Sequence, residues 1–265
     1  MFKYIFTTIF TTFMISNASA QDKIETQKPK IGTGIDTSIA FQNKLFNQDK
    51  IKFGIVAGVT YANIYGKEID YIFADSKTTW QPSLHIGIEV NSMIGAHLSI
   101  KNELILNQRE AGVTLVDTFT GNKYTSKLKT LYLELYPFSL AYSYKNLQIY
   151  AGPYVSALVN AGIKRKDVNG NSYTDKTIYE TPSNDETVQK YLQKIDYGLA
   201  SGVSYDLPFG FFISAKYTYG FADIFQFANS FSLGDPKTDK INIYNKAILI
   251  SIGYTLSKNK KGIDF

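Results

Sequence analysis

The stretch LHIGIEVNSMIGAHLSIKNELIL, residues 84–106, alternates apolar and polar side chains, turns near a glycine, and then alternates again. One face of its first run is apolar and consists of Leu84, Ile86, Ile88 and Val90, whereas the other carries His85, Gly87, Glu89 and Asn91. The second run separates Leu98, Ile100, Leu104 and Leu106 from His97, Ser99, Lys101 and Glu103. A period of two indicates β-strands whose two faces meet different surroundings.

The same alternation recurs along much of the chain, in residues 52–61, 128–144, 147–159, 194–205, 211–221 and 246–256. With the two runs of the quoted stretch, these segments make about eight strands, most of them near the ten residues that a tilted strand needs to cross a bilayer. In the segment 128–144 the apolar parity changes between Leu135 and Leu140. Because Pro137 lies between them and cannot donate a ladder hydrogen bond, we expect a β-bulge there.

The connections between these segments alternate in length. Short turns lie near residues 92–96, 145–146 and 206–210, and long polar connections occupy roughly 62–80, 110–127, 160–193 and 222–245. A soluble β-sandwich has no reason to sort its loops in this way, whereas an outer-membrane barrel has short periplasmic turns and long extracellular loops. We therefore predict an all-β fold over residues 51–256, a transmembrane up-and-down antiparallel β-barrel.

In this fold the two faces of each strand have different surroundings. Backbone groups in hydrocarbon must all be paired, which strands achieve only in a closed sheet. The apolar face then meets lipid, and the polar face lines the lumen, the reverse of a soluble barrel. The lumen face carries charges of both signs, which we interpret as a structural cluster: Glu89, Lys101, Glu103, Glu134, Asp196 and Lys216.

The hairpin of the quoted stretch also yields an expected register. A three-residue turn over 93–95, with Gly95 in the left-handed conformation, places Glu89 opposite Ser99. Lys101 is then the diagonal neighbour of Glu89, within reach of an ion pair inside the lumen.

The two ends of the chain have compositions of their own. Residues 1–20, MFKYIFTTIFTTFMISNASA, have one early lysine, an apolar core and a small-x-small ending, which predicts a secretory signal peptide cleaved after Ala20, with an uncleaved anchor as the alternative. Residues 21–50 are a polar lead-in, or contain an extra strand near 31–42, and residues 257–265 form a short basic tail. The chain has no cysteine, so it forms no disulfide.

The candidate chemistry is sparse. The formal net charge is +5 and the basic residues are scattered, which argues against a nucleic-acid partner. The two histidines, His85 and His97, share the lumen parity and lack further ligands, so we expect no metal site, no cofactor and no Ser–His–acid group facing lipid. The polar stretch 168–191 is either a recognition surface or a disordered spacer.

Several segments in order resemble a known family: IKFGIVAGVTYANI (51–64), PSLHIGIEVNSMIGAHLSIKNELILNQREAG (82–112), TLYLELYPFSLAYSY (130–144), LQIYAGPYVSALV (147–159), KIDYGLASGVSYDLPFGFFISAKYTYGFADI (194–224) and ILISIGYTL (248–256). Over nearly the whole mature chain they resemble the PorT-like outer-membrane β-barrel proteins of Bacteroidetes. The chain departs from the family at its end, where SKNKKGIDF follows Leu256. The resemblance implies an outer-membrane location and supplies no catalytic motif.

From these observations we expect a non-enzymatic integral outer-membrane protein, a binding or secretion- and envelope-associated scaffold that acts through its loops. The alternatives are a small channel for solutes, because eight strands enclose a narrow lumen, and a lipid-modifying outer-membrane enzyme, which rests on analogy alone. The expected partners are outer-membrane lipid, the barrel-assembly machinery and a protein at the extracellular loops or the periplasmic face. We expect a monomer.

Overall fold

The structure is a computed structural model that describes residues 51–117, 120–167, 169–176, 192–225 and 242–256. The expected signal peptide, the lead-in with its alternative strand at 31–42, and the basic tail lie outside the described residues, as do residues 168 and 177–191 of the polar stretch.

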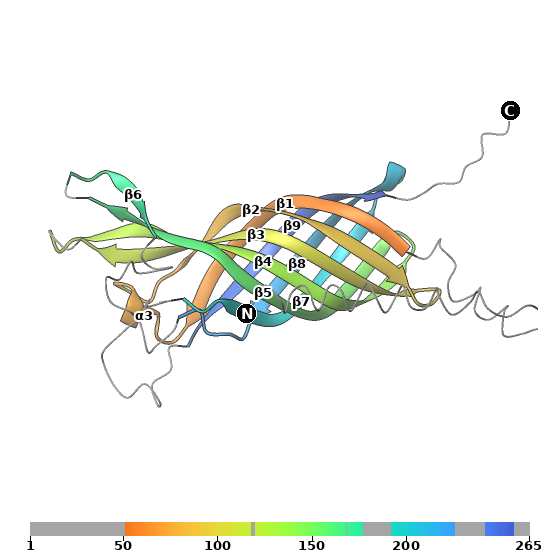
Figure 1. Ribbon diagram of the computed structural model, residues 1–265, viewed down its shortest axis with the longest axis horizontal. Helices are drawn as coiled ribbons and strands as arrows, with labels where there is room; N and C mark the ends of the chain where they lie inside the picture. Colours follow the sequence, from red (N-terminus) through yellow and green to blue (C-terminus); the bar gives the residue numbers. More distant parts are fainter. Residues whose placement is uncertain (1–50, 118–119, 168, 177–191, 226–241, 257–265) are drawn as a thin grey trace, which may run out of the picture. The chain divides into compact units, whose positions relative to one another are not determined.

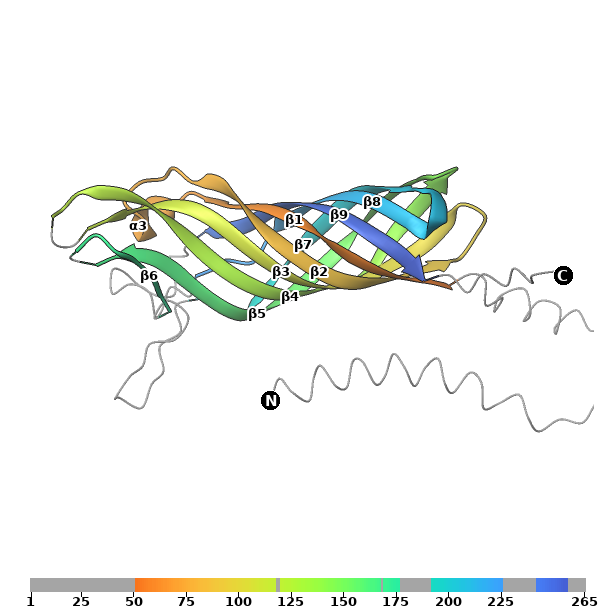
Figure 2. The same cartoon turned by 90° about the horizontal axis from the view of Figure 1, so that it is seen from above.

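Eight antiparallel strands close into a ring, which confirms the predicted fold. They are β1 (Ile51–Gly66), β2 (Thr79–Met93), β3 (Leu98–Val116), β4 (Lys123–Tyr144), β5 (Leu147–Lys166), β7 (Ile195–Asp206), β8 (Phe211–Gly220) and β9 (Ile243–Leu256). Each strand pairs with the next along the chain, and β9 pairs with β1 over its whole length. The short strand β6 (Ser172–Asp175) pairs antiparallel with the outer end of β5. Figures 1 and 2 show the strands tilted around a common axis.

The two faces of the strands lie on the predicted sides of the ring. On β2, Leu84 and Ile86 are 69% and 61% exposed on the outside of the ring, whereas His85 and Glu89 are buried inside it. Exposed aromatic side chains lie near both ends of this outer apolar belt, Tyr61, Trp80, Tyr197 and Tyr219 at one end and Phe53, Tyr142, Tyr144, Tyr205 and Tyr254 at the other. Aromatic residues at these two levels are typical of barrels that cross an outer membrane.

The connections sort to opposite ends of the ring. The β2–β3, β4–β5 and β7–β8 connections are short and share one end, here called the short-turn end. The opposite, loop end carries the remaining connections, and the β1–β2 connection there contains the short helix α3 (Ile69–Ile72). No helix among the described residues combines the length and apolar character needed to cross a membrane.

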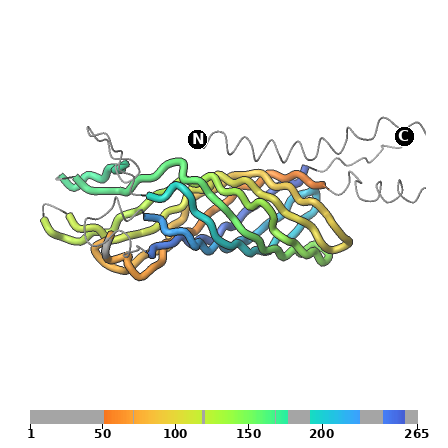
Figure 3. The backbone as a smooth tube through the Cα atoms, turned by 60° about the horizontal axis from the view of Figure 1, so that its bottom comes forward, coloured from red at the N-terminus to blue at the C-terminus, as the bar shows by residue number. Residues whose placement is uncertain are grey.

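Two hairpins project beyond the other strands at the loop end, as Figure 3 shows for β3–β4 and β5–β6. The expected long loop at 110–127 was therefore wrong, because β3 continues to Val116 and β4 already begins at Lys123. Likewise β5 continues to Lys166, inside the expected loop at 160–193. Beyond the membrane an outward side chain no longer has to be apolar, so the alternation fades while the backbone ladder continues.

The β2–β3 register differs from the expected one. Glu89 faces Glu103 rather than Ser99, and the turn is wider, with the amides of Ile94 and Gly95 both donating to the carbonyl of Leu98. Gly95 does not adopt a positive φ angle, so the three-residue turn was wrong. The shift moves Lys101 from one diagonal of Glu89 to the other, which keeps the two residues adjacent.

The expected bulge at Pro137 is confirmed. The β3–β4 ladder pairs Lys101 with Ser139 but Glu103 with Tyr136, so β4 has an extra residue at the proline. After the bulge Leu140 faces outward, and both halves of β4 keep their apolar side chains on the outside.

Candidate functional site

The lumen contains a buried group of charges nearer the short-turn end, here called the lower cluster: Glu89, Lys101, Glu103 and Lys216. The Lys101 ammonium lies 2.9 Å from the Glu89 carboxylate and 3.6 Å from that of Glu103. Lys216 reaches Glu103 from β8, on the other side of the barrel. It also lies 3.7 Å from the centre of the Tyr136 ring, a cation–π contact. Two lysines and two carboxylates therefore bridge strands that lie far apart around the ring.

A second group, here called the upper cluster, lies nearer the loop end and has Arg109 at its centre. The Arg109 guanidinium lies 2.7 Å from Glu134 and 3.2 Å from Asp196, which belong to β4 and β7. Arg109 is 2% exposed and Glu134 is fully buried. Tyr136 donates to the second carboxylate oxygen of Glu134, so that both Glu134 oxygens have partners, as a buried ion pair requires to be tolerated. At Asp196 the donors, Asn245 among them, all reach Oδ2, and Oδ1 is buried without a hydrogen-bond partner among the described residues.

His85 belongs to a chain of hydrogen bonds that reaches the upper cluster. Its Nδ1 atom lies 2.9 Å from the Thr60 hydroxyl, which donates to Asn107. Asn107 in turn donates to Glu134 over 2.9 Å. On its other side, the Nε2 atom of His85 lies 2.8 Å from the Ser251 hydroxyl. The ring is thus held by hydroxyl groups from two neighbouring strands rather than by a carboxylate.

His97 is separate from this chain. It is exposed at the short-turn end, where its Nδ1 lies 3.0 Å from the carbonyl of Ser143. Among the described residues, no three histidine or acidic side chains come close enough together to hold a metal ion. The two histidines therefore do not form a common site.

An apolar layer, here called the apolar cap, packs at the loop end above the charges. Its buried members come from the outer parts of the strands and from the connections: Ile64, Ile69, Phe73, Ala111, Val113, Leu115, Leu128, Tyr132, Leu158, Ala161, Ile163, Leu192, Ile224, Phe225 and Ile243. Phe73, next to α3, packs edge-on against Phe225 with ring centres 6.1 Å apart. Phe73 of the β1–β2 connection and Phe225, shortly after β8, thus meet in this layer.

The structure brings together all six charges that the sequence places on the lumen face, but in two groups rather than one. The residue that sequence reasoning missed is Arg109, the hub of the upper cluster. It lies in LNQREAG (106–112), where polar residues occupy both faces and the strand signal ends. The continuation of its lumen parity, from Lys101 through Glu103, was the signal that could have found it.

The comparisons with known proteins give one family and several structural likenesses. The profile of a family described as outer membrane protein beta-barrel domain matches residues 23–226. Among solved structures, the Neisserial surface protein A is 11% identical, with 76% of this chain and 96% of that chain covered and a TM-score of 0.39. For Ail of Yersinia pestis the identity is 10%, the coverage 78% and 99%, and the TM-score 0.40. OprG from Pseudomonas aeruginosa is 14% identical, with 77% of this chain and 95% of that chain covered and a TM-score of 0.38. No curated protein matches the chain.

Proposed function

Because its residues 23–226 match the family profile, the chain belongs to the outer membrane protein beta-barrel domain family, and we propose that this outer-membrane barrel is a closed binding scaffold rather than a pore or an enzyme. The observation that carries the proposal is the filled interior. Lys101, Arg109 and Tyr136 each have at most 2% of their surface exposed, so these side chains occupy the cross-section of the lumen.

A second feature supports a closed barrel. A solute that passed the two charged clusters would still meet the apolar cap, where Phe73, Leu192 and Phe225 are buried. Opening a path would require separating the partners of the ion pairs and exposing apolar side chains, and both changes cost free energy. The small-channel alternative therefore needs a rearrangement that nothing in the packing favours.

The enzyme alternative has one geometric argument, the 2.8 Å contact between Ser251 and His85. A serine nucleophile of this type needs a base that a carboxylate orients, and a route for the substrate. Here Thr60 takes the place of the carboxylate, and the pair lies inside the filled lumen. We propose that the contact is structural and that the protein has no catalytic residue.

The binding surface in this proposal is the loop end, where β3–β4 and β5–β6 project (Figure 3). Binding residues are often presented on connections that a rigid scaffold positions. The segments quoted above resemble PorT-like proteins, so we propose a protein partner from a secretion or envelope assembly, bound at these hairpins or at the periplasmic, short-turn end. The cleaved signal peptide and the monomeric state belong to the same proposal.

Two experiments test the scaffold proposal. In planar lipid bilayers the refolded protein should give no steady single-channel steps, because the lumen is filled; regular steps would favour the channel instead. In cells, a photo-crosslinking residue at Asn122 or Ser172 should capture one defined protein, with Lys145 at the opposite end as the matched position. Capture at none of the three positions would contradict a scaffold that works through its ends.

A further inference from the structure

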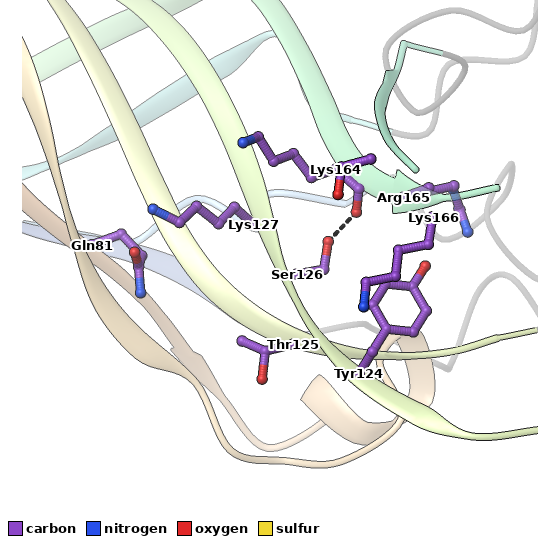
Figure 4. Close-up of a pocket in the computed structure, with 9 residues that line it drawn as sticks. Gln81, Tyr124, Thr125, Ser126, Lys127, Lys164, Arg165 and Lys166 are labelled. Carbon is purple, nitrogen blue, oxygen red and sulfur yellow. Dashed lines mark hydrogen bonds between the residues drawn. The ribbon is translucent and has the colours of Figure 1, made fainter. Parts of the chain in front are cut away.

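A small notch separates the two projecting hairpins. The β4–β5 ladder ends at the pair Leu128–Ile163, and beyond it β5 keeps only its pairing with β6, on its other edge. The gap encloses about 160 Å³ and is lined by Gln81, Tyr124, Thr125, Ser126, Lys127, Lys164, Arg165, Lys166 and Ser172. Figure 4 shows the Ser126 hydroxyl directed at the carbonyl of Lys164 across its floor. The notch therefore lies where β4 and β5 separate, and its walls belong to the two projecting hairpins.

The lining of the notch has an excess of positive charge. Arg165 is neutralised by Asp175, with 2.6 Å between guanidinium and carboxylate. Glu110 is shared between Lys127 and Lys129, at 3.8 Å and 3.0 Å. Neither Lys164 nor Lys166 has an ion pair with any residue in the described part of the chain. Of the three lysines that line the notch, only Lys127 has an acidic partner, and it shares that carboxylate with Lys129. This excess of positive charge suits an anionic ligand.

The level of the notch along the strands identifies that ligand. On β4 the outward apolar series ends at Leu131, and the next outward residues are Lys129 and Lys127. On β5 the series ends at Val159, and the next charged outward residue is Lys164. Lysines just beyond the apolar belt lie at the level of the lipid headgroups. In the outer leaflet of an outer membrane, those headgroups are the phosphorylated sugars of lipopolysaccharide.

We propose that the notch binds a phosphate group of the lipid A headgroup of lipopolysaccharide. Lys127 and Lys164 supply the charge from opposite walls, and Gln81 and Ser172 supply neutral hydrogen-bonding groups. The Tyr124 ring, with the Lys166 ammonium 5.6 Å from its centre, forms the remaining wall. A volume of about 160 Å³ suits one phosphate-bearing group rather than a whole ligand, so the acyl chains would lie along the apolar belt below.

The test is a titration of the full barrel in detergent with bisphosphorylated lipid A and with the same lipid A after its phosphates are removed, followed by native mass spectrometry. We expect the phosphorylated form to bind at least about 10-fold more tightly. The variant K127Q/K164Q should lose about 10- to 30-fold of that affinity, as expected for two lysines at a membrane surface. The control K52Q/K145Q removes the same charge at the short-turn end and should bind like the wild type.

Four outcomes would overturn the proposal. They are equal binding of both forms of lipid A, an equal loss in the control variant, displacement by millimolar inorganic phosphate, and equally tight binding of a sulfated polysaccharide that K127Q/K164Q also abolishes. The last two outcomes would assign the notch to a free anion or to an acidic polysaccharide. Folding of each variant is verified by heat-modifiable gel migration, and Lys164→Gln alone, at an exposed position, serves if the double variant does not fold.

Discussion

Replacing Lys101 by Met should destabilise the barrel more than any conservative change on its outer face. Lys101 is 1% exposed and pairs with Glu89 and Glu103, which face each other across the β2–β3 ladder. Without the ammonium, two buried carboxylates oppose each other. Lys216 still neutralises Glu103, so the penalty falls mainly on Glu89. Removing one partner of a buried ion pair costs about 3–5 kcal/mol, which is the loss of unfolding free energy expected here.

The assay is urea unfolding of the refolded protein in lipid vesicles, read as the midpoint and slope of the transition. The matched control is Ile100→Leu on the neighbouring outward position, which conserves volume and should cost less than about 1.5 kcal/mol. Adding Glu89→Gln to Lys101→Met should recover part of the loss, with a coupling energy of about 0.5–3 kcal/mol. A cost of Lys101→Met below about 1 kcal/mol, or no recovery in the double variant, would refute the reasoning.

Two further changes probe other parts of the barrel. Gly253→Ala should destabilise it by about 1–3 kcal/mol in the same unfolding assay, because the new Cβ would overlap the Phe212 ring, whereas Gly95→Ala meets Leu98 Cβ at an ordinary 3.8 Å and should change stability by less than about 0.5 kcal/mol; equal costs would contradict this packing. Asp223, outside the membrane, is half-buried, and burial raises its pKa to about 6 from 3.8. At a pH between the two pKa values, the folded state keeps a proton that the unfolded state has lost. The stability of the loop end should therefore fall as pH rises from about 4 to about 6 and stay level above pH 6. The protection of the Ile224 amide against hydrogen exchange should fall over the same pH range, and Asp223→Asn should abolish this dependence. Protection that rises with pH in the wild type would contradict the sign.

The strand faces were predictable because lipid imposes a strict rule on them. Most outward positions within the membrane are apolar and the backbone groups there are paired, so residues such as Leu84 and Glu89 reveal their faces by parity alone. Even the bulge at Pro137 follows, because a change of parity must be absorbed somewhere in the ladder. None of these inferences requires knowledge of contacts between distant strands.

Three features could not be predicted from the parity of the strands, because they depend on distances in the folded barrel. The β2–β3 register depends on the width of a turn, and the alternation is unchanged when the pairing shifts by an even number of residues. The division of the charges into two clusters depends on where Arg109 lies along the barrel axis. The apolar cap unites Phe73, Leu192 and Phe225 from separate connections, and outside the membrane no periodic signal marks such residues.

The central claim, a barrel that crosses the outer membrane with its projecting hairpins outside, is tested most directly by cysteine labelling in intact cells. The chain has no cysteine of its own, so single substitutions at Asn122, Lys145 and Ile86 report on the loop end, the short-turn end and the outer apolar belt. With a membrane-impermeant maleimide, Asn122→Cys should react in intact cells, Lys145→Cys only after the outer membrane is permeabilised, and Ile86→Cys in neither condition. Labelling of Lys145→Cys in intact cells while Asn122→Cys stays protected, or of Ile86→Cys as fast as Asn122→Cys, would contradict the account.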